Sequence, residues 1–290
     1  MKQQGHFLLM NRSEFRDWLQ KQKITRSINK LQVHHTASPN YATRKMKNGV
    51  AQQDPFTCLE GMRNYHVYTN KWRATGQNMT IMEDGRVAIS LDRDLNQTPA
   101  GITNQNHGSI CIEIIGNFDK NNDVMTNEQQ QSIVHVYACL CEKLSIPVNT
   151  SHIVYHAWFT SSGIRLSDYT PGKSSKTCPG TNIWGQGNTV ATANKGFIPA
   201  IKQELERLKN ETVDQPMTAN EKKAFEELKE QVASLNRKSI MQDIPDYAQP
   251  AIDALSKMKD KNGNPVLNTI NGRSKDFYDI ITVLFRAGLF

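Results

Sequence analysis

The alternation of apolar and polar residues along the first part of the chain predicts short β-strands. Residues 31–36 (LQVHHT) alternate with the period of two that a half-buried strand requires, and residues 109–118 (SICIEIIGNF) and 152–159 (HIVYHAWF) predict two more strands. Residues 79–90 (MTIMEDGRVAIS) predict a hairpin, because the central Asp-Gly pair suits a type I′ turn between two alternating strands.

Helical patterns fall between these strands. The predicted helices cover residues 12–23, 54–68, 126–144 and 197–209. The second opens with an Asp-Pro pair and the third with a Thr/Gln capping box, both typical of helix starts. Strands that alternate with helices predict an α/β fold with a mixed central sheet flanked by helices.

A change of pattern divides the chain into two predicted domains. Residues 1–210 form the α/β domain, residues 211–217 (ETVDQPM) a linker, and residues 218–290 a small all-helical domain. In the last part, apolar residues recur at alternating spacings of three and four, which predicts an amphipathic helix and, as one explanation, a homodimer contact through it. These residues are Phe225, Leu228, Val232 and Leu235.

Two adjacent histidines end the first strand, and strand parity separates them. Side chains alternate between the faces of a strand, so His34 shares a face with Gln32 and Thr36, whereas His35 shares a face with Val33. The apolar set should face the core. We therefore expect His34 to line a site and His35 to be structural.

Composition narrows the classes of partner. The 290 residues carry a formal net charge of +7, and the pI is about 9.1, which favours an anionic partner such as a bacterial wall polymer. We expect no nucleic-acid partner, because the sequence has no zinc-finger spacing and no run of basic residues. We expect no membrane segment either, since no apolar stretch approaches about 18 residues.

The cysteines and the N-terminus bear on the compartment. Five cysteines are an odd number in a long chain, so a disulfide framework is not expected. The first residues (MKQQGHFLLM) hold only a short apolar run, unlike a secretory signal. The expectation is synthesis in the cytoplasm.

Two predicted strands each contain a histidine near their end, and a cysteine lies in a third, turn-rich segment. His34, His156 and Cys178 would supply three ligands for tetrahedral zinc and leave a fourth position open, as in catalytic zinc sites. Glu113 lies on the face of its strand opposite Ile110, Ile112 and Ile114, where a carboxylate is costly unless it is paired or functional.

Several motifs, in the same order along the chain, carry a family resemblance. They are QVHHTA, WRATGQNMTIMEDGRV, SICIEIIGNF, IVYHAWF and KTCPG. Over about residues 12–205 the chain resembles the zinc-dependent N-acetylmuramoyl-L-alanine amidases, the superfamily that includes phage amidase endolysins and peptidoglycan recognition proteins.

The resemblance implies roles for five residues. His34, His156 and Cys178 match the zinc ligands, Glu113 matches the catalytic glutamate, and Lys176 matches the lysine two positions before the last ligand. The implied reaction is hydrolysis of the amide between N-acetylmuramic acid and L-alanine of peptidoglycan. Zinc would activate water, Glu113 would transfer its proton, and Lys176 would stabilise the oxyanion.

Two positions depart from the family pattern. Some relatives place a catalytic tyrosine where this chain has Gln77, which shifts the acid/base role onto Glu113. The 21 residues between His156 and Cys178 exceed the spacing of compact relatives, and we expect this insert to form a loop beside the groove.

Other interpretations of these residues remain. Glu113 could pair with an arginine, and Lys173 could replace Lys176. Trp72, Trp158 and Trp184 could line a saccharide groove, although core packing is the favoured interpretation. The remaining histidines are expected to be structural or exposed; they include His35, His66, His135 and His152.

Rival functions are a thiol amidase with Cys178 as nucleophile and His156 as base, and a peptidoglycan-binding protein without activity. Pro179 weakens the thiol hypothesis, because it lacks the backbone N–H that would stabilise a thiolate. Modular architecture predicts wall binding by the C-terminal domain. The expected setting is a phage or prophage endolysin that reaches the wall when the membrane is breached, and the alternative is a bacterial autolysin.

Overall fold

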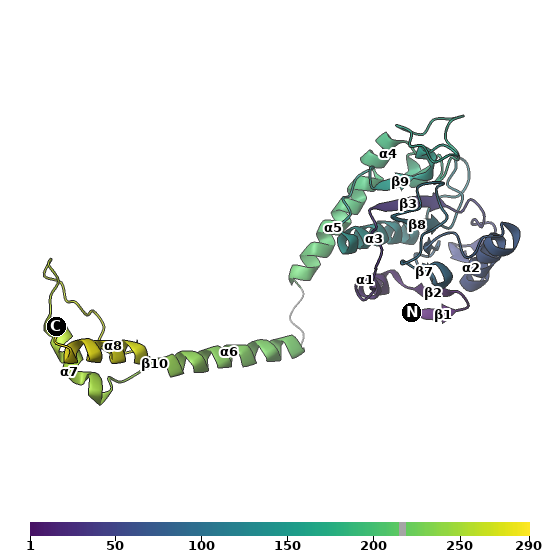
Figure 1. The fold of residues 1–290 in the computed structure, drawn as a ribbon. Helices are drawn as coiled ribbons and strands as arrows, with labels where there is room; N and C mark the ends of the chain where they lie inside the picture. The colour runs from purple at the N-terminus through teal and green to yellow at the C-terminus, as the bar shows by residue number, and fades with distance from the viewer. Residues whose placement is uncertain (215–218) are drawn as a thin grey trace. The chain divides into compact units, whose positions relative to one another are not determined.

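The computed structural model describes residues 1–214 and 219–290, and the chain forms two compact units that divide after Asp214. The first unit is built on a seven-stranded sheet in the order β1-β2-β7-β6-β8-β3-β9 (Figure 1). Its strands are β1 (Lys2–Gln4), β2 (Phe7–Met10), β3 (Lys30–His35), β6 (Met79–Ile81), β7 (Val87–Ser90), β8 (Ser109–Ile114) and β9 (Ile153–Tyr155).

The sheet is mixed, as predicted. Strands β6, β8, β3 and β9 run parallel to one another, whereas β1, β2, β7 and β6 pair in antiparallel fashion. The first two strands were not predicted. The four-residue run of β2 is too short to be recognised from its pattern and is defined by its pairing with β7.

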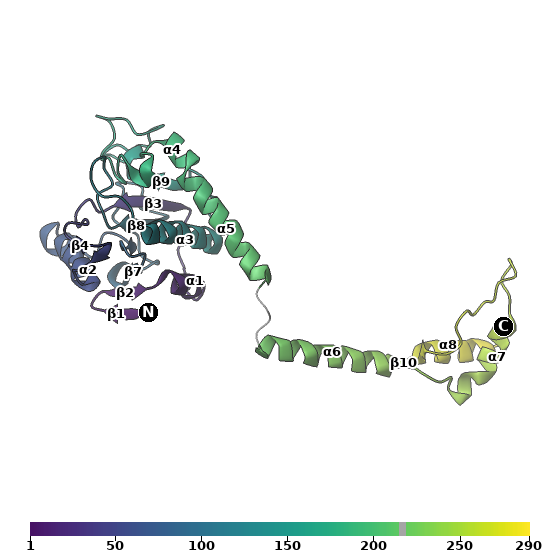
Figure 2. The same cartoon turned by 180° about the vertical axis from the view of Figure 1, so that it is seen from behind.

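Helices cover both faces of this sheet (Figures 1 and 2). Leu31 and Val33 of β3 and the isoleucines of β8 belong to the main core, together with residues of α3 (Asn127–Leu144). On the same side, α1 (Arg12–Gln20) and α5 (Phe197–Asp214) both pack against α3, and α4 (Val190–Lys195) precedes α5.

The opposite face of the sheet carries α2. This helix (Pro55–Asn64) begins at Asp54, whose side chain accepts a hydrogen bond from Thr57 N, and it continues as a π-helical turn, η1 (Tyr65–Thr69). Its buried residues form a second core with β2 and β7. Short elements complete the unit: β4 (Met46–Lys47), β5 (Val50–Ala51), η2 (Leu91–Arg93), η3 (His156–Trp158) and η4 (Ile183–Gly185).

The boundary of the first unit corrects the predicted linker. Helix α5 runs to Asp214, so residues 211–214 are helical, because no glycine or proline interrupts this stretch before Pro216. The remainder of the predicted linker, residues 215–217, lies outside the described residues, and so does Thr218.

The second unit is small and mostly helical. It contains α6 (Ala219–Ser239), η5 (Asp246–Ala248), α7 (Gln249–Lys257) and α8 (Lys275–Arg286). It is not all-helical as predicted, because β10 (Ile240–Met241) and β11 (Arg273–Ser274) form a two-residue antiparallel ladder. Among the described residues, its core is one cluster, formed by Ala248, Ala251, Ile252, Tyr278 and Ile281.

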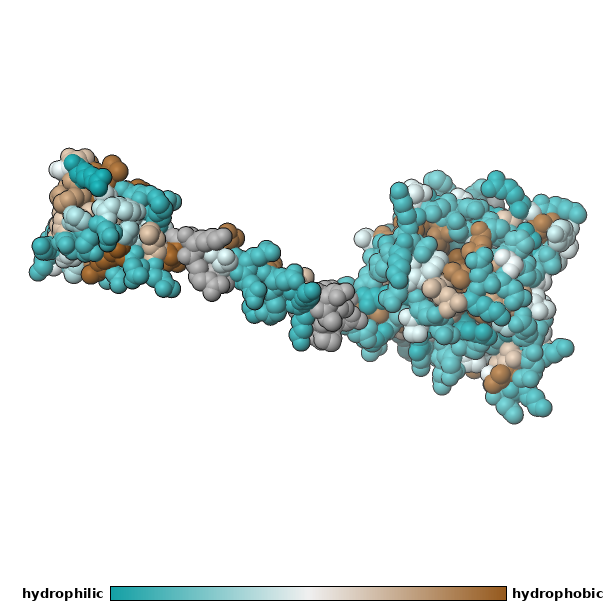
Figure 3. Space-filling model, turned by 90° about the horizontal axis from the view of Figure 1, so that it is seen from below, coloured by the Kyte–Doolittle hydropathy of each residue, from teal (hydrophilic) through white to brown (hydrophobic). Residues whose placement is uncertain are grey.

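Apolar side chains also lie on the surface of the second unit (Figure 3). The predicted stripe of α6 is exposed, with exposed fractions between 48% for Phe225 and 65% for Leu235. None of the helices in the described part of the chain combines the length and the apolar character needed to cross a membrane.

Candidate metal centre

The register of the parallel strands gathers the predicted residues at one edge of the sheet. His34 of β3 pairs with Glu113 of β8, so their side chains share a face. Gln32 pairs with Val154 of β9, which places His156, two residues later, on the same face as His34. The strand pairings therefore place His34, Glu113 and His156 on one face.

Cys178 reaches this edge on a loop held by hydrogen bonds. Its carbonyl oxygen accepts from Ala157 N at 2.6 Å, directly after His156. Asp119 accepts hydrogen bonds from Thr177 Oγ1 at 3.0 Å and from Thr181 N at 2.9 Å, on either side of the cysteine. The loop is thus fixed independently of any bound group.

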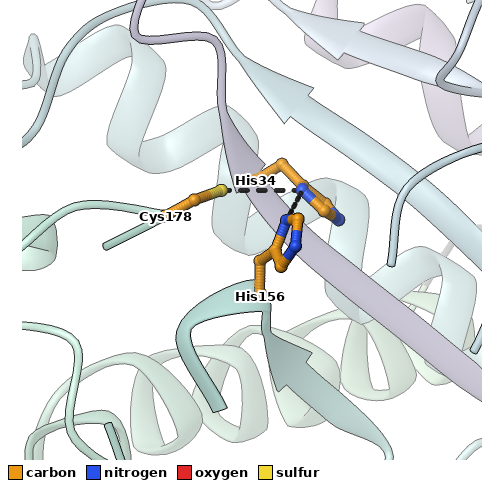
Figure 4. Close-up of side chains that lie close together, drawn as sticks. All are labelled: His34, His156 and Cys178. Atoms are coloured by element: carbon orange, nitrogen blue, oxygen red, sulfur yellow. Dashed lines mark hydrogen bonds between the residues drawn. The ribbon is translucent and has the colours of Figure 1, made fainter. Parts of the chain in front are cut away.

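His34, His156 and Cys178, called here the ligand triad, converge on one point (Figure 4). His34 Nδ1 lies 3.3 Å from His156 Nδ1 and 3.5 Å from Cys178 Sγ. Tetrahedral zinc with ordinary Zn–N and Zn–S bonds requires edges of about 3.3 Å and about 3.6 Å. The triad could therefore bind a metal ion such as zinc.

A second set of potential ligand atoms shares one histidine with the triad. His34, Cys111 and Glu113 also lie within 4.8 Å of one another. Two edges of the triad match those of tetrahedral zinc, and so we take the triad as the candidate metal centre.

Gln32 orients the first histidine, a role that the sequence analysis missed. Its Oε1 lies 3.2 Å from His34 Nε2, and it also accepts a hydrogen bond from Ile102 N. If His34 Nε2 carries the proton donated to Gln32, Nδ1 is left with a lone pair for a metal. Strand parity had placed Gln32 on the correct face, but its contact with Ile102 depends on a distant loop.

Burial sets the protonation of the triad. It lowers the pKa of His34 well below its ordinary value, and it lowers the pKa of His156 to about 4, so both rings are neutral ligands near neutral pH. Burial also raises the pKa of the Cys178 thiol well above its ordinary range. A nearby cation is needed for the thiolate, which suits a metal ligand better than a free nucleophile.

Glu113 is the carboxylate beside the triad. Burial raises its pKa to about 8, and the positive charge of Lys176 opposes that rise. Among the described residues, Glu113 Oε2 has no hydrogen-bond partner and no arginine forms an ion pair with Glu113. The arginine interpretation therefore does not hold. The buried arginine pair is that of Arg44 with Glu83, at 2.8 Å.

These residues lie in a groove of about 930 Å³. Glu113 and the triad line it, and Lys176 does so as well, whereas Lys173 does not. The predicted insert is mostly loop, and its last residues, Lys176 and Thr177, line the groove.

The opposite wall comes from α2, η1 and the segment that follows. Trp72 is 37% exposed and lines the groove, and its ring stacks on the ring of His66 with 4.8 Å between the two centroids. This corrects the expectation that Trp72 packs in the core. Trp158 is fully buried in the core as expected, and the partly buried Trp184 packs against Phe197. Gln77, fully buried apart from 1% of its surface, is also a lining residue.

The other histidines have structural contacts. His35 Nδ1 accepts a hydrogen bond from Phe118 N at 3.1 Å, and His66 Nδ1 accepts one from Gly76 N at 3.1 Å. His135 contacts Glu204, and His152 contacts Asn149. His35 and His66 also line the groove, so their contacts fix side chains at the site.

Two neutral histidines, a buried cysteine and a glutamate meet where the parallel strands of a mixed sheet end, and they define an α/β domain with a candidate metal centre. The profile of the N-acetylmuramoyl-L-alanine amidase family matches residues 24–181, more than half of the chain. The protein belongs to this family.

Two relatives at about 30% identity agree with this assignment. Peptidoglycan-recognition protein SC2 of Drosophila melanogaster is 31% identical over 154 residues, which are 53% of this chain and 69% of the relative. Peptidoglycan-recognition protein SC1a of the same species is 30% identical over 156 residues, with the same shares. The solved structure of Drosophila PGRP-LB aligns with a TM-score of 0.41 at 16% identity, over 60% of this chain and 83% of that one.

Proposed function

We propose that the protein is a zinc-dependent peptidoglycan hydrolase that cleaves the amide between N-acetylmuramic acid and L-alanine. The observation that carries the proposal is the ligand triad, whose spacing suits tetrahedral zinc in a member of the amidase family. The names of its relatives support peptidoglycan as the substrate.

The surrounding residues would divide the work of hydrolysis. A zinc ion held by the triad would lower the pKa of water and polarise the scissile carbonyl. Glu113, which lines the groove, would take the proton of the attacking water and return it to the leaving amine. The Lys176 ammonium would stabilise the negative charge that develops on the carbonyl oxygen.

Mass spectrometry of digested peptidoglycan, combined with metal analysis, tests this proposal. Wild type should contain zinc and release stem peptides with a free N-terminal L-alanine, and Cys178→Ser should lose both properties. Wild type without zinc, or cleavage within the glycan or the stem peptide, would contradict the proposal.

The two rival functions give different results. A thiol amidase would be inactivated by iodoacetamide in metal-free buffer, whereas the zinc enzyme would lose activity to a chelator and regain it with zinc. A protein that only binds would adhere to purified walls without releasing peptides. The filled triad favours catalysis over binding alone.

We further propose that the second unit binds the cell wall, with an anionic wall polymer as a candidate ligand. The modular architecture of the chain supports this proposal, because the second unit is compact and has a hydrophobic core of its own. The alternative is a homodimer through the exposed stripe of α6. Removal of residues 215–290 separates these proposals. Wall binding falls in the first case, and in the second the mass in solution changes from that of two chains to that of one truncated chain.

As biological setting we propose lysis of a bacterial host by a phage or prophage, with the protein made in the cytoplasm and released to the wall. An autolysin of the same chemistry is the alternative. Expression in a bacterium with and without a pore-forming membrane protein tests this setting. Lysis that requires the pore supports the phage role, and lysis without it contradicts that role.

A further inference from the structure

One glycine on the groove wall has no explanation in the packing of the chain. Gly61 lies in the interior of α2, is exposed and lines the groove. A Cβ placed on it would meet no atom within 4 Å beyond its own stretch of helix, whereas a Cβ at Gly76 would lie 2.8 Å from Trp72 Cζ3. Packing therefore explains Gly76 but not Gly61. Glycine destabilises a helix interior, so the open space at Gly61 has a cost that no contact within the described chain offsets.

Gly61 forms a gap between two larger side chains on the same face of the helix. Thr57 precedes it by four residues and Tyr65 follows it by four, and all three residues line the groove. The backbone N–H of Tyr65 donates to the carbonyl oxygen of Gly61, so the helical spacing is kept between them. Thr57 is exposed and Tyr65 is 58% exposed, so both sides of the gap are accessible from the groove.

Aromatic rings continue from this gap along the same wall. The centroid of the Tyr65 ring lies 6.3 Å from that of His66, and the His66 ring stacks on Trp72 with 17° between the two planes. All three residues line the groove. Aromatic rings of this kind offer flat apolar faces to a ligand that is apolar on one side and polar on its rim.

The charges of the groove lie away from this wall. Among the described residues, none of those that line the groove between positions 53 and 76 is an Asp, Glu, Lys or Arg. Burial lowers the pKa of His66, so its ring is neutral near neutral pH. The charged lining residues are Glu113, Asp119 and Lys176, which belong to other segments. The wall formed by α2 therefore suits an uncharged ligand.

We propose that the gap at Gly61 is a subsite for a sugar ring of the glycan strand, which packs against the backbone of α2 and beside the Tyr65 ring. This inference rests on the proposed function, because the muramoyl amide joins an uncharged sugar to a charged peptide. A pyranose ring has C–H faces and a rim of hydroxyl groups, which fits a gap beside an aromatic ring. The stem peptide then lies toward Asp119 and Lys176.

Gly61→Leu in the full chain tests the subsite by filling the gap. Leucine favours a helix more than glycine does, so the variant should fold, with Tm raised by about 1–4 °C. Calorimetric binding of the disaccharide of N-acetylglucosamine and N-acetylmuramic acid should weaken about tenfold, as expected for an overfilled site. Binding of the free peptide L-alanyl-D-isoglutaminyl-L-lysine should not change.

Asn64→Leu is the matched control. It places the same side chain at an exposed position of α2 that does not line the groove, so it should leave disaccharide binding unchanged. Gly61→Ala adds only one carbon to the gap and should weaken disaccharide binding less than Gly61→Leu does. A sugar site in the second unit would contribute equally to wild type and to all three variants.

The outcomes separate this inference from the proposed function. Equal disaccharide binding by wild type and Gly61→Leu, or no binding by wild type, would overturn the sugar subsite. Weaker binding of the peptide by Gly61→Leu, alone or together with the disaccharide, would assign the wall to the stem peptide and overturn it as well. These measurements do not require hydrolysis. If wild type does not cleave the muramoyl amide, the proposed function fails, while selective loss of disaccharide binding in Gly61→Leu still supports the subsite.

Discussion

Two clusters of the first unit contain histidine and cysteine side chains within contact distance, yet their chemistry differs. One is the ligand triad at the edge of the sheet. The other, called here the helix cluster, consists of His135 and Cys139 on α3 and Glu204 on α5. His135 Nδ1 lies 2.7 Å from Glu204 Oε1, and its Nε2 lies 3.5 Å from Cys139 Sγ.

The difference lies in where the lone pairs point. In the helix cluster both nitrogens of His135 are engaged by neighbours, Arg207 holds Glu204, and none of these residues lines the groove. In the ligand triad the nitrogens and the sulfur converge on one point that opens into the groove. Residue types alone do not make a metal site; a shared focus and access to it do.

The largest effect should distinguish the two clusters directly. His34→Ala should reduce zinc from about one ion per chain to near zero and activity to background, because three protein ligands are needed for a catalytic zinc site. His135→Ala should retain both. Metal analysis by mass spectrometry and peptide release measure the two outcomes, and equal loss of zinc in both variants would contradict the distinction.

Glu113→Gln should retain zinc and lower kcat by about 10²- to 10⁴-fold, the usual contribution of a general base. Glutamine keeps the shape of the side chain but cannot accept the water proton. Glu204→Gln in the helix cluster is the control and should leave kcat unchanged. Loss of zinc from Glu113→Gln would instead make Glu113 a ligand, and the set with Cys111 would then need to replace the triad.

The same glutamate should make the stability of the metal-free protein depend on pH. Burial raises the pKa of Glu113 from 4.5 to about 8, so the folded chain binds this proton more tightly than the unfolded chain. The stability it contributes is complete below pH 4.5 and is lost as the pH rises through about 8. Relative to wild type, Glu113→Gln should gain up to about 1.4 kcal/mol per pH unit in this interval.

Urea denaturation at pH 5 and pH 8 measures this gain. Glu204 should show the opposite sign: burial opposes its ionisation, but hydrogen bonds from Arg207 and His135 lower its pKa, so its contribution is lost as the pH falls. Parallel pH profiles for wild type and Glu113→Gln would show that the Glu113 carboxyl group is not perturbed.

Lys176→Ala should lower kcat by about 10²- to 10³-fold, as removal of one oxyanion-stabilising group does. Lys173→Ala is the matched control from the same segment, and it should leave kcat unchanged because Lys173 does not line the groove. The reverse result would support the interpretation in which Lys173 replaces Lys176.

Local periodicity accounts for what could be predicted from the sequence. The period of two in the strands put His34 on the face of Glu113 and set Glu113 apart from the isoleucines of its strand, although His35 lines the groove as well. Contacts between distant segments could not be predicted in this way. The exposure of Trp72 depends on where η1 ends, and the pairing of β2 with β7 joins segments that are far apart in the chain.

Gln32 should give the smallest effect and the sharpest comparison, because it orients His34 as Glu204 orients His135. Gln32→Leu should weaken zinc affinity by about 10- to 100-fold, as loss of the partner of a ligating histidine usually does. Gln32 does not line the groove, so the zinc-saturated variant should keep the wild-type kcat. Competition with a chelator measures the affinity. Gln32→Glu, which keeps an acceptor for His34 Nε2, should bind zinc more tightly than Gln32→Leu, and equal affinity in the two variants would show that orientation of His34 is not the role of Gln32.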